Sequence, residues 1–221
     1  MNNNLLFYGK RVLFIGAHPD DIELGCGALI AKIAKLAEVY CVTLSDNQKN
    51  PRLSNLLNEH YESMNILGVD KEHIIIRQFI TRKFIHDRQE ILEYLYQLNR
   101  ELSPQIVFVH SSADLHQDHG VATQESLRAF RGTSIFGFDV IRSSHGFFPS
   151  LLIEVSEADM EKKVSALSAY KTYSDVYYFD QQLTRAILIR NGALAERPFA
   201  EGFDIMKIVG EFSTTITNDK A

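Results

Sequence analysis

Two short segments of the chain concentrate the residue types that can bind a metal ion and move protons. The first is His18-Pro19-Asp20-Asp21. The second runs from His110 to His119 and contains three of the eight histidines together with two aspartates. Imidazole nitrogens and carboxylate oxygens are common zinc ligands, and a carboxylate that is not bound to the metal can accept a proton from water. Together, the two segments predict a metal-dependent hydrolytic site.

A structural explanation of the first segment competes with the chemical one. Asp20 and Glu23 have the spacing of a capping box, and acidic side chains near a helix N-terminus complement the helix dipole. This explanation accounts for Asp20 and Glu23 without any catalysis. It does not account for His18 beside a second carboxylate, so we favour a site while a helix cap stays the alternative for this segment.

In the second segment, His116 and His119 are three residues apart, so one helical turn would place them on the same side. A lone histidine is more often structural than a metal ligand. Three histidines within ten residues at the end of an expected strand favour a site instead. Asp118 can orient an imidazole without binding the metal itself. Two histidines and one carboxylate would leave an open position on the ion, as in catalytic zinc sites.

The elements that must position these segments alternate between strand-like and helix-like patterns. Strands are predicted over Arg11–Ala17, Glu38–Leu44, His73–Arg77 and Gln105–His110, and helices over Leu24–Leu36, a stretch after Pro51 that ends at Leu67, Asp87–Leu102 and Gln117–Phe130. This order predicts an α/β, Rossmann-like fold with a mostly parallel sheet and helices on both faces. In the doubly wound strand order 3-2-1-4-5, the first and fourth strands are neighbours, so both segments would open into one crevice.

The second half of the chain has a less regular pattern. Strands are predicted over Phe138–Arg142, Leu151–Val155 and Phe203–Val209, and helices over Ser156–Tyr170 and Gln181–Ile189. Ser156 and Asp159 have the spacing of a capping box. No repeat or linker divides the chain, so we expect a single domain over residues 1–221.

Composition excludes several functional classes. The net charge of −5 provides no broad basic field, so we expect no nucleic-acid partner. The two cysteines, Cys26 and Cys41, lie in apolar contexts and are expected to be buried thiols. No apolar run approaches the roughly 20 residues that a membrane span needs, and no targeting segment is visible. The expected location is the cytoplasm.

The paired segments resemble the motifs of the PIG-L/LmbE-like family of zinc-dependent N-acetylglucosamine deacetylases, which includes deacetylases of bacillithiol, mycothiol and GPI-anchor synthesis. The first motif spans Ala17–Gly25 and the second Asp114–His119. The resemblance continues through Leu67-Gly68-Val69, Phe148-Pro149, Lys162–Tyr170 and Phe199–Phe203, and so covers nearly the whole chain.

The resemblance implies a role for each matching residue. His18, Asp21 and His119 would bind Zn²⁺, and Asp20 would be the general base that activates the metal-bound water and passes its proton to the leaving amine. His116, as an imidazolium, would stabilise the tetrahedral oxyanion, with Asp118 holding it charged and oriented. Nitrogen and oxygen ligands accept several divalent ions, so another divalent metal is the alternative to zinc.

Two positions depart from the family pattern, and both concern the substrate. Many relatives carry an arginine where this chain has Leu56, and proline is frequent where this chain has Gln117. Arg52, one turn before Leu56, is a candidate substitute for the missing arginine. Arg142, which follows an expected strand, is a second candidate for contact with a polar substrate or its phosphate.

Several other residues have weaker functional explanations. Tyr170, Tyr173, Tyr177 and Tyr178 could stack on a sugar, but a core or interface role is the favoured explanation. Glu201 lies in a family-like segment and is expected to be structural or to line the pocket.

The expected reaction is therefore hydrolysis of an N-acetyl group on an amino-sugar-containing small molecule, either a GlcNAc-type conjugate or a sugar nucleotide. One alternative is an amidase of the same fold that acts on a different amide conjugate. Another is a non-catalytic sugar-binding protein, although the complete set of expected metal ligands argues against it. The resemblance also allows for a homo-oligomer.

Overall fold

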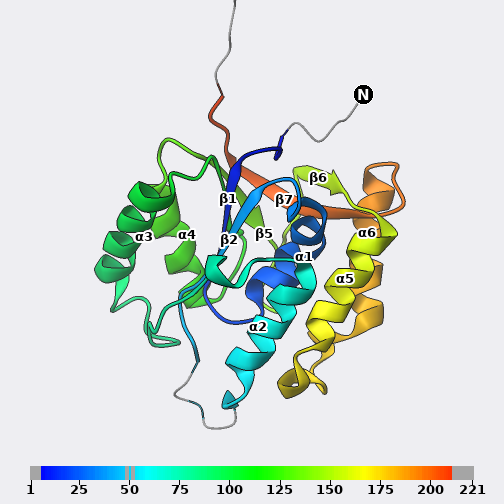
Figure 1. Ribbon diagram of the computed structural model, residues 1–221, viewed down its shortest axis with the longest axis horizontal. Helices are drawn as coiled ribbons and strands as arrows, with labels where there is room; N and C mark the ends of the chain where they lie inside the picture. Colours follow the sequence, from blue (N-terminus) through cyan, green and yellow to red (C-terminus); the bar gives the residue numbers. More distant parts are fainter. Residues whose placement is uncertain (1–5, 48–49, 51–52, 211–221) are drawn as a thin grey trace, which may run out of the picture.

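The sheet of the computed structural model is built almost entirely from the strands that the sequence predicts. The structure describes residues 6–47, 50 and 53–210. Within these residues seven strands form one sheet in the order β3-β2-β1-β4-β5-β7-β6 (Figure 1). Strands β1 to β5 pair in parallel, whereas β7 pairs antiparallel with both β5 and β6. The strands are β1 (Arg11–Gly16), β2 (Glu38–Thr43), β3 (Ile74–Ile76), β4 (Ile106–His110), β5 (Ser134–Phe138), β6 (Leu151–Glu154) and β7 (Ala200–Lys207).

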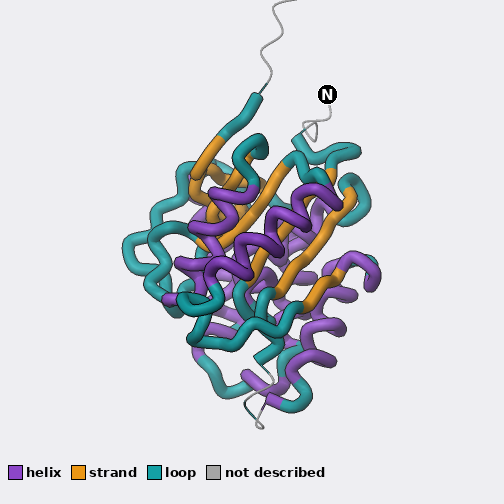
Figure 2. Tube along the Cα trace, turned by 90° about the vertical axis from the view of Figure 1, so that its left-hand side faces the viewer, coloured by secondary structure: helices purple, strands orange, loops and turns teal. Residues whose placement is uncertain are grey.

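Helices cover both faces of this sheet, as the strand and helix order predicts (Figures 1 and 2). One face carries α1, α2, α5 and α6, and the opposite face carries α3 and α4. The helices are α1 (Asp21–Ile33), α2 (Leu56–Leu67), α3 (Arg88–Leu102), α4 (Gln117–Ala129), α5 (Glu157–Ser168) and α6 (Gln181–Leu194). The expected α/β architecture and its 3-2-1-4-5 order are confirmed. No helix among the described residues is long and apolar enough to span a membrane.

One strand prediction was wrong in position. The sequence pattern predicts a strand over Phe138–Arg142, but β5 covers Ser134–Phe138. Glycine is disfavoured in strands, so Gly137 interrupts the apolar signal. A side chain at Gly137 would meet the backbone of Ser111 at 2.9 Å, which explains why packing requires a glycine inside this strand.

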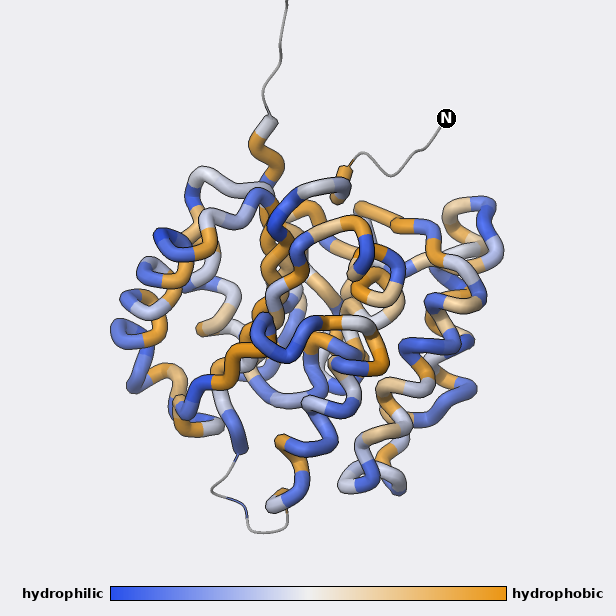
Figure 3. Tube along the Cα trace, in the orientation of Figure 1, coloured by the Kyte–Doolittle hydropathy of each residue, from blue (hydrophilic) through white to orange (hydrophobic). Residues whose placement is uncertain are grey.

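The core lies on both faces of the sheet because successive side chains of a strand point to opposite sides. In β1, Phe14 packs with the cluster under α1 and α2, whereas Leu13 and Ile15 pack with the cluster under α3 and α4. Hydrophobic residues accordingly gather on the strands and on the helix sides that face them (Figure 3). Packing on both faces therefore fixes where β1 and β4 end and where the loops that follow them begin.

Helix α1 is held to the sheet by a buried ion pair. Lys163 of α5 donates to Glu201 of β7 and to the carbonyl of Leu24, both at 2.6 Å. The Glu201 carboxylate also accepts from the backbone N–H groups of Ala28 (3.0 Å) and Leu29 (2.6 Å). Lys163 and Glu201 are both buried. Glu201 therefore has a structural role: it holds α1 in place against β7 and α5. The N-terminus of α1 carries the first candidate segment.

We predict that Glu201→Gln lowers the free energy of unfolding by about 3–5 kcal/mol, because it leaves the Lys163 ammonium buried without its counter-charge. Urea denaturation measures this loss. Glu161→Gln is the matched control, since the Glu161–Arg185 pair lies on the surface and is screened by solvent. An equal change in the two variants would contradict the prediction.

Candidate active site

The first candidate segment turns sharply as it leaves β1. Asp21 is the first residue of α1, and its Oδ2 accepts the backbone N–H of His18 at 2.7 Å. Asp20 occupies the helix N-cap position with φ 109°, a conformation that L-residues rarely adopt, and its side chain makes no capping hydrogen bond. Glu23 instead contacts His60 and Tyr170 in the core. The helix-cap explanation of Asp20 and Glu23 was therefore wrong.

The second candidate segment begins helix α4. His116 is the N-cap residue, and its Nδ1 accepts the backbone N–H of Asp118 at 3.2 Å. His119 lies in the first turn of the helix and donates from Nδ1 to Asp114 Oδ2 at 2.8 Å. Gln117 is the first helical residue, a position at which proline is readily accepted. The departure from the family pattern at Gln117 is therefore structurally neutral.

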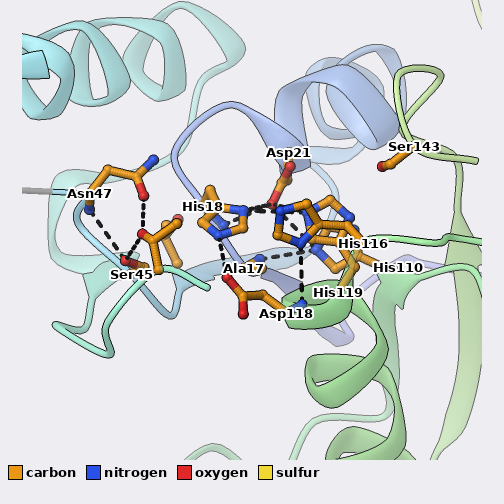
Figure 4. A network of polar contacts seen from close by, with 12 residues as sticks. Ala17, His18, Asp21, Ser45, Asn47, His110, His116, Asp118, His119 and Ser143 are labelled. Atoms are coloured by element: carbon orange, nitrogen blue, oxygen red, sulfur yellow. Dashed lines mark hydrogen bonds and ion pairs between the residues drawn. The ribbon is translucent and has the colours of Figure 1, made fainter. Parts of the chain in front are cut away.

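The parallel pairing of β1 with β4 brings both segments to one point, where the side chains of His18, Asp21 and His119 converge (Figure 4). His18 Nδ1 and His119 Nε2 are 3.3 Å apart. Each of these nitrogens lies 3.4 Å from Asp21 Oδ2. Three atoms from residues predicted as metal ligands thus form a nearly equilateral triangle.

This triangle fits a tetrahedral metal ion. Zinc with ligand bonds of about 2.0–2.1 Å would hold its ligand atoms roughly 3.3–3.4 Å apart. His18 donates from Nε2 to Asp118 Oδ2 at 3.0 Å, and His119 donates from Nδ1 to Asp114. The remaining nitrogen of each ring therefore faces the other ring and Asp21. A cation that displaced the proton of His18 Nδ1 would be met by three converging acceptors, whereas without a cation that proton can be shared with Asp21.

The Asp118 carboxylate has a different partner from the one that the resemblance implies. We expected it to orient His116, but it accepts from His18 Nε2 and from the backbone N–H of Arg82 at 2.6 Å. The reason is the helix start: Asp118 contacts His116 through its backbone N–H, while its carboxylate is engaged by His18 and by the loop before α3. Carboxylates of this kind commonly orient metal-binding histidines.

The two adjacent aspartates have opposite electrostatic environments. Burial, followed by repulsion from Asp21, raises the pKa of Asp20 well above its ordinary value. Burial also acts to raise the pKa of Asp21, but His119 and His110 outweigh it and hold that pKa well below the ordinary value. Burial acts to lower the pKa of His18, yet the hydrogen bonds with Asp118 and Asp21 raise it to about 9. The carboxylates therefore favour positive charge within the triangle.

His116 differs from the imidazolium that the resemblance implies. Its Nδ1 accepts a hydrogen bond and so carries no proton in this geometry. Burial, followed by the charges of His119 and His18, lowers the pKa of His116 to about 4. The ring is arranged as a neutral imidazole whose Nε2–H is free to donate.

A cavity of about 650 Å³ opens above these residues, and the candidate base and ligands lie in its wall. Arg142, Tyr173 and Tyr178 form another part of the wall, and Arg142 donates to the Tyr178 hydroxyl at 3.2 Å. The cavity is lined in part by His18, Asp20, Asp21, Ser45, Asn47, Thr81, Arg82, His116, His119, Arg142, Tyr173 and Tyr178. Apolar side chains, among them Leu24, Phe79, Ile80 and Val140, share the wall with these polar groups.

The remaining candidates are distributed differently. Tyr170 is buried in the core and Tyr177 is exposed, so only two of the four tyrosines line the cavity. Leu56, at the position of the family arginine, is buried in an apolar cluster with Leu167, Tyr170 and Phe179. Arg52 lies outside the described residues.

Two participants in the site were given no role from sequence. Asp114 is the partner of His119, and its position in the second motif was the available signal. The loop before α3 supplies the backbone N–H groups of Arg82 and Phe84 to Asp118. Every residue except proline has a backbone N–H group, so residue types do not indicate which of these groups donate to Asp118.

We predict that Asp20→Gly is more stable than Asp20→Ala by about 1 kcal/mol, because only glycine relieves the strain of φ 109°. Both variants remove the carboxylate, so their difference isolates the backbone term. Denaturant unfolding in the presence of a chelator measures it without a contribution from metal binding. A more stable alanine variant would show that the backbone at Asp20 is unstrained.

Comparison with known proteins extends these observations. The family model PIG-L, described as GlcNAc-PI de-N-acetylase, matches residues 13–130. An uncharacterized deacetylase, YaiS of Escherichia coli (strain K12), is 31% identical over 170 residues, which cover 74% of this chain and 91% of that protein.

Solved structures share the fold at lower identity. The conserved protein TT1542 from Thermus thermophilus has a TM-score of 0.76 and 24% identity, and the match covers 92% of this chain and 97% of the other. The N,N'-diacetylchitobiose deacetylase from Pyrococcus horikoshii has a TM-score of 0.74 and 21% identity over 89% and 84% of the two chains. GalB, a 4-carboxy-2-hydroxymuconate hydratase from Pseudomonas putida KT2440, has a TM-score of 0.74 and 16% identity over 92% and 99%.

Proposed function

The chain belongs to the PIG-L family of deacetylases, and on that premise we propose that it is a metal-dependent hydrolase that removes an N-acetyl group from an amino-sugar-containing small molecule. A GlcNAc-type conjugate or a sugar nucleotide is the expected substrate. The fold alone does not decide the reaction, because a hydratase shares it. The observation that carries the proposal is the triangle of ligand atoms at 3.3–3.4 Å with a buried carboxylate beside it, in the wall of a cavity.

His18, Asp21 and His119 would hold the metal, for which we propose Zn²⁺ in preference to another divalent ion. When bound, such an ion supplies Lewis acidity that polarises the amide carbonyl and lowers the pKa of water. Asp118 and Asp114 fix the tautomers of the two histidines, so that Nδ1 of His18 and Nε2 of His119 present lone pairs. Metal binding therefore requires no rearrangement of these rings.

Asp20 is the proposed general base. It accepts a proton from the attacking water as the water oxygen bonds to the amide carbon. Asp20 then returns this proton to the amide nitrogen, the C–N bond breaks, and the products are acetate and a free amine. Two features support the assignment: the Asp20 side chain faces the cavity, and no hydrogen bond to a described residue engages its carboxylate.

His116 is the proposed hydrogen-bond donor to the oxyanion that forms on the carbonyl oxygen. Because Nδ1 accepts from the backbone of Asp118, the ring is held with Nε2–H on its far side. His116 lines the cavity, and its ring centroid is 5.0 Å from that of His18. Asp118 contributes indirectly, by orienting His18 and anchoring the start of α4.

The wall formed by Arg142, Tyr173 and Tyr178 is the proposed contact surface for the sugar. The Arg142 guanidinium lies 5.5 Å from the centre of the Tyr178 ring and hydrogen bonds to its hydroxyl, so its orientation is restrained. Aromatic rings can stack on the apolar face of a sugar, while a guanidinium donates to hydroxyl or anionic oxygens. Arg52 stays a further proposed contact.

We predict that Asp20→Asn reduces kcat by about 10²–10⁴-fold while the variant still binds metal, because it removes the base and leaves the three ligands. Acetate release from N-acetylglucosamine conjugates measures turnover, and metal content is measured on the same samples. A chelator should abolish wild-type turnover, and added Zn²⁺ should restore it. Purified protein without stoichiometric divalent metal, together with unchanged turnover in Asp20→Asn, would overturn the mechanism.

A substrate panel separates the proposal from its alternatives. Varying the acyl group and the sugar independently tests whether the protein is an N-deacetylase or an amidase of another conjugate. The N-deacetylase should prefer acetyl over larger acyl groups on the same sugar. Tight sugar binding with no turnover in the presence of zinc would instead support a non-catalytic binding protein.

We predict that Arg142→Met raises KM by roughly tenfold with little change in kcat, because a charge-assisted hydrogen bond to substrate is lost while the apolar stem is kept. Arg100→Met, at an exposed position of α3, is the control and should leave KM unchanged. An unchanged KM in Arg142→Met would show that the guanidinium does not contact the substrate.

A further inference from the structure

His110, the last residue of β4, is a buried histidine for which the proposed mechanism has no use. It is completely buried and does not line the large cavity. Its Nε2 nevertheless lies only 3.4 Å from Asp21 Oδ2. By distance alone, Asp21, His110 and His119 form a second group that could hold a metal. The hydrogen bonds of His110 decide between a ligand and a supporting role.

The His110 side chain continues the pairing of β1 and β4 where their backbones stop pairing. The parallel register between these strands ends at Phe14 and Phe108. Beyond that point, the backbone N–H of Ala17 donates to His110 Nε2 at 3.0 Å. The carbonyl of Ala17 accepts from Ser45 on the side of β2, at 2.9 Å. Ala17, the residue immediately before His18, is thereby held from both neighbouring strands.

This arrangement excludes His110 as a ligand. The lone pair of Nε2 is engaged by the Ala17 N–H, and Nδ1 is buried without a hydrogen-bond partner in the structure. While Nε2 accepts from the Ala17 N–H it has no second lone pair in the ring plane to offer to a metal. The ring also stacks on His119, with centroids 3.8 Å apart and planes inclined by 14°.

We propose that His110 is a positioning residue that sets the geometry of the metal triangle through the hydrogen bond from Ala17 to Nε2. The inference rests on the proposed metal-dependent function. Because Ala17 is held in place, the backbone that follows it takes a defined path. This path places His18 Nδ1 and Asp21 Oδ2 next to His119 Nε2. Supporting contacts of this kind typically change metal affinity by about 10–100-fold when they are removed.

Three substitutions of His110 distinguish the effect of its hydrogen-bond acceptor from the effect of its ring. In His110→Gln the amide oxygen can occupy the place of Nε2 and accept from Ala17. In His110→Asn the amide is one bond shorter and cannot reach. His110→Phe keeps a ring against His119 but has no acceptor. We expect the Zn²⁺ dissociation constant to rise by about 10–100-fold in the asparagine and phenylalanine variants and to stay within about threefold of wild type in the glutamine variant.

The readout is competition for Zn²⁺ with a chromophoric chelator, with thermal unfolding of the metal-free proteins as the check on folding. The asparagine and glutamine side chains both lack the ring and differ only in length. Comparing these two variants therefore tests the role of the acceptor even if the phenylalanine variant does not fold. Equal affinities in the two, at equal metal-free unfolding temperatures, would overturn the proposal. Retained affinity in the phenylalanine variant alone would assign the effect to stacking and would also overturn it.

The outcome for the wild-type protein separates this inference from the proposed function. If wild type binds no Zn²⁺ and releases no acetate, the proposed function fails. If wild type binds Zn²⁺ and all three variants lose it equally, the imidazole itself is required, and only the present inference fails. KM should not change in the glutamine variant, since His110 does not line the cavity.

Discussion

The parallel pairing of β1 with β4 is the constraint on which the candidate active site depends. It places His18 within hydrogen-bonding distance of Asp118, one hundred residues away in the chain. Parallel neighbours end at the same edge of a sheet, so the loops that follow them must share one space. The buried side chains of β1 and β4 belong to the cores on both faces of the sheet, which prevents either strand from slipping relative to the other. Site geometry is therefore a consequence of core packing.

Within this frame, two consecutive aspartates acquire different chemistry because the backbone turns between them. Asp21 begins α1 and faces histidines, so its negative charge is balanced. Asp20 occupies a strained N-cap position, where its carboxylate faces the cavity and the charge of its neighbour. A regular helical conformation at Asp20 would rotate its side chain away from this position. Strain at φ 109° thus accompanies the different surroundings of the two consecutive carboxylates.

Residue patterns predicted four of the five parallel strands, and the doubly wound order predicted that the segments of His18 and His119 would open into one crevice. Such patterns succeed where burial imposes a period on the chain. They failed at β5, because Gly137 serves a close backbone contact and carries no strand signal. They also failed for the partner of Asp118 and for His110, since hydrogen bonds to backbone groups such as Arg82 N–H depend on loop paths that side-chain chemistry does not encode.

Several residues in the wall of the cavity come from loops and helices other than those that carry the proposed metal ligands. Leu56, where relatives often carry an arginine, packs with Tyr170 and Phe179 and contributes only apolar contacts. The guanidinium whose charge acts on Asp20 comes instead from Arg142, on the loop after β5. Loops at this edge can exchange such groups without disturbing the sheet. The converging atoms of His18, Asp21 and His119 therefore come from the ends of β1 and β4, whereas the positive charge in the wall of the cavity comes from Arg142 on a separate loop.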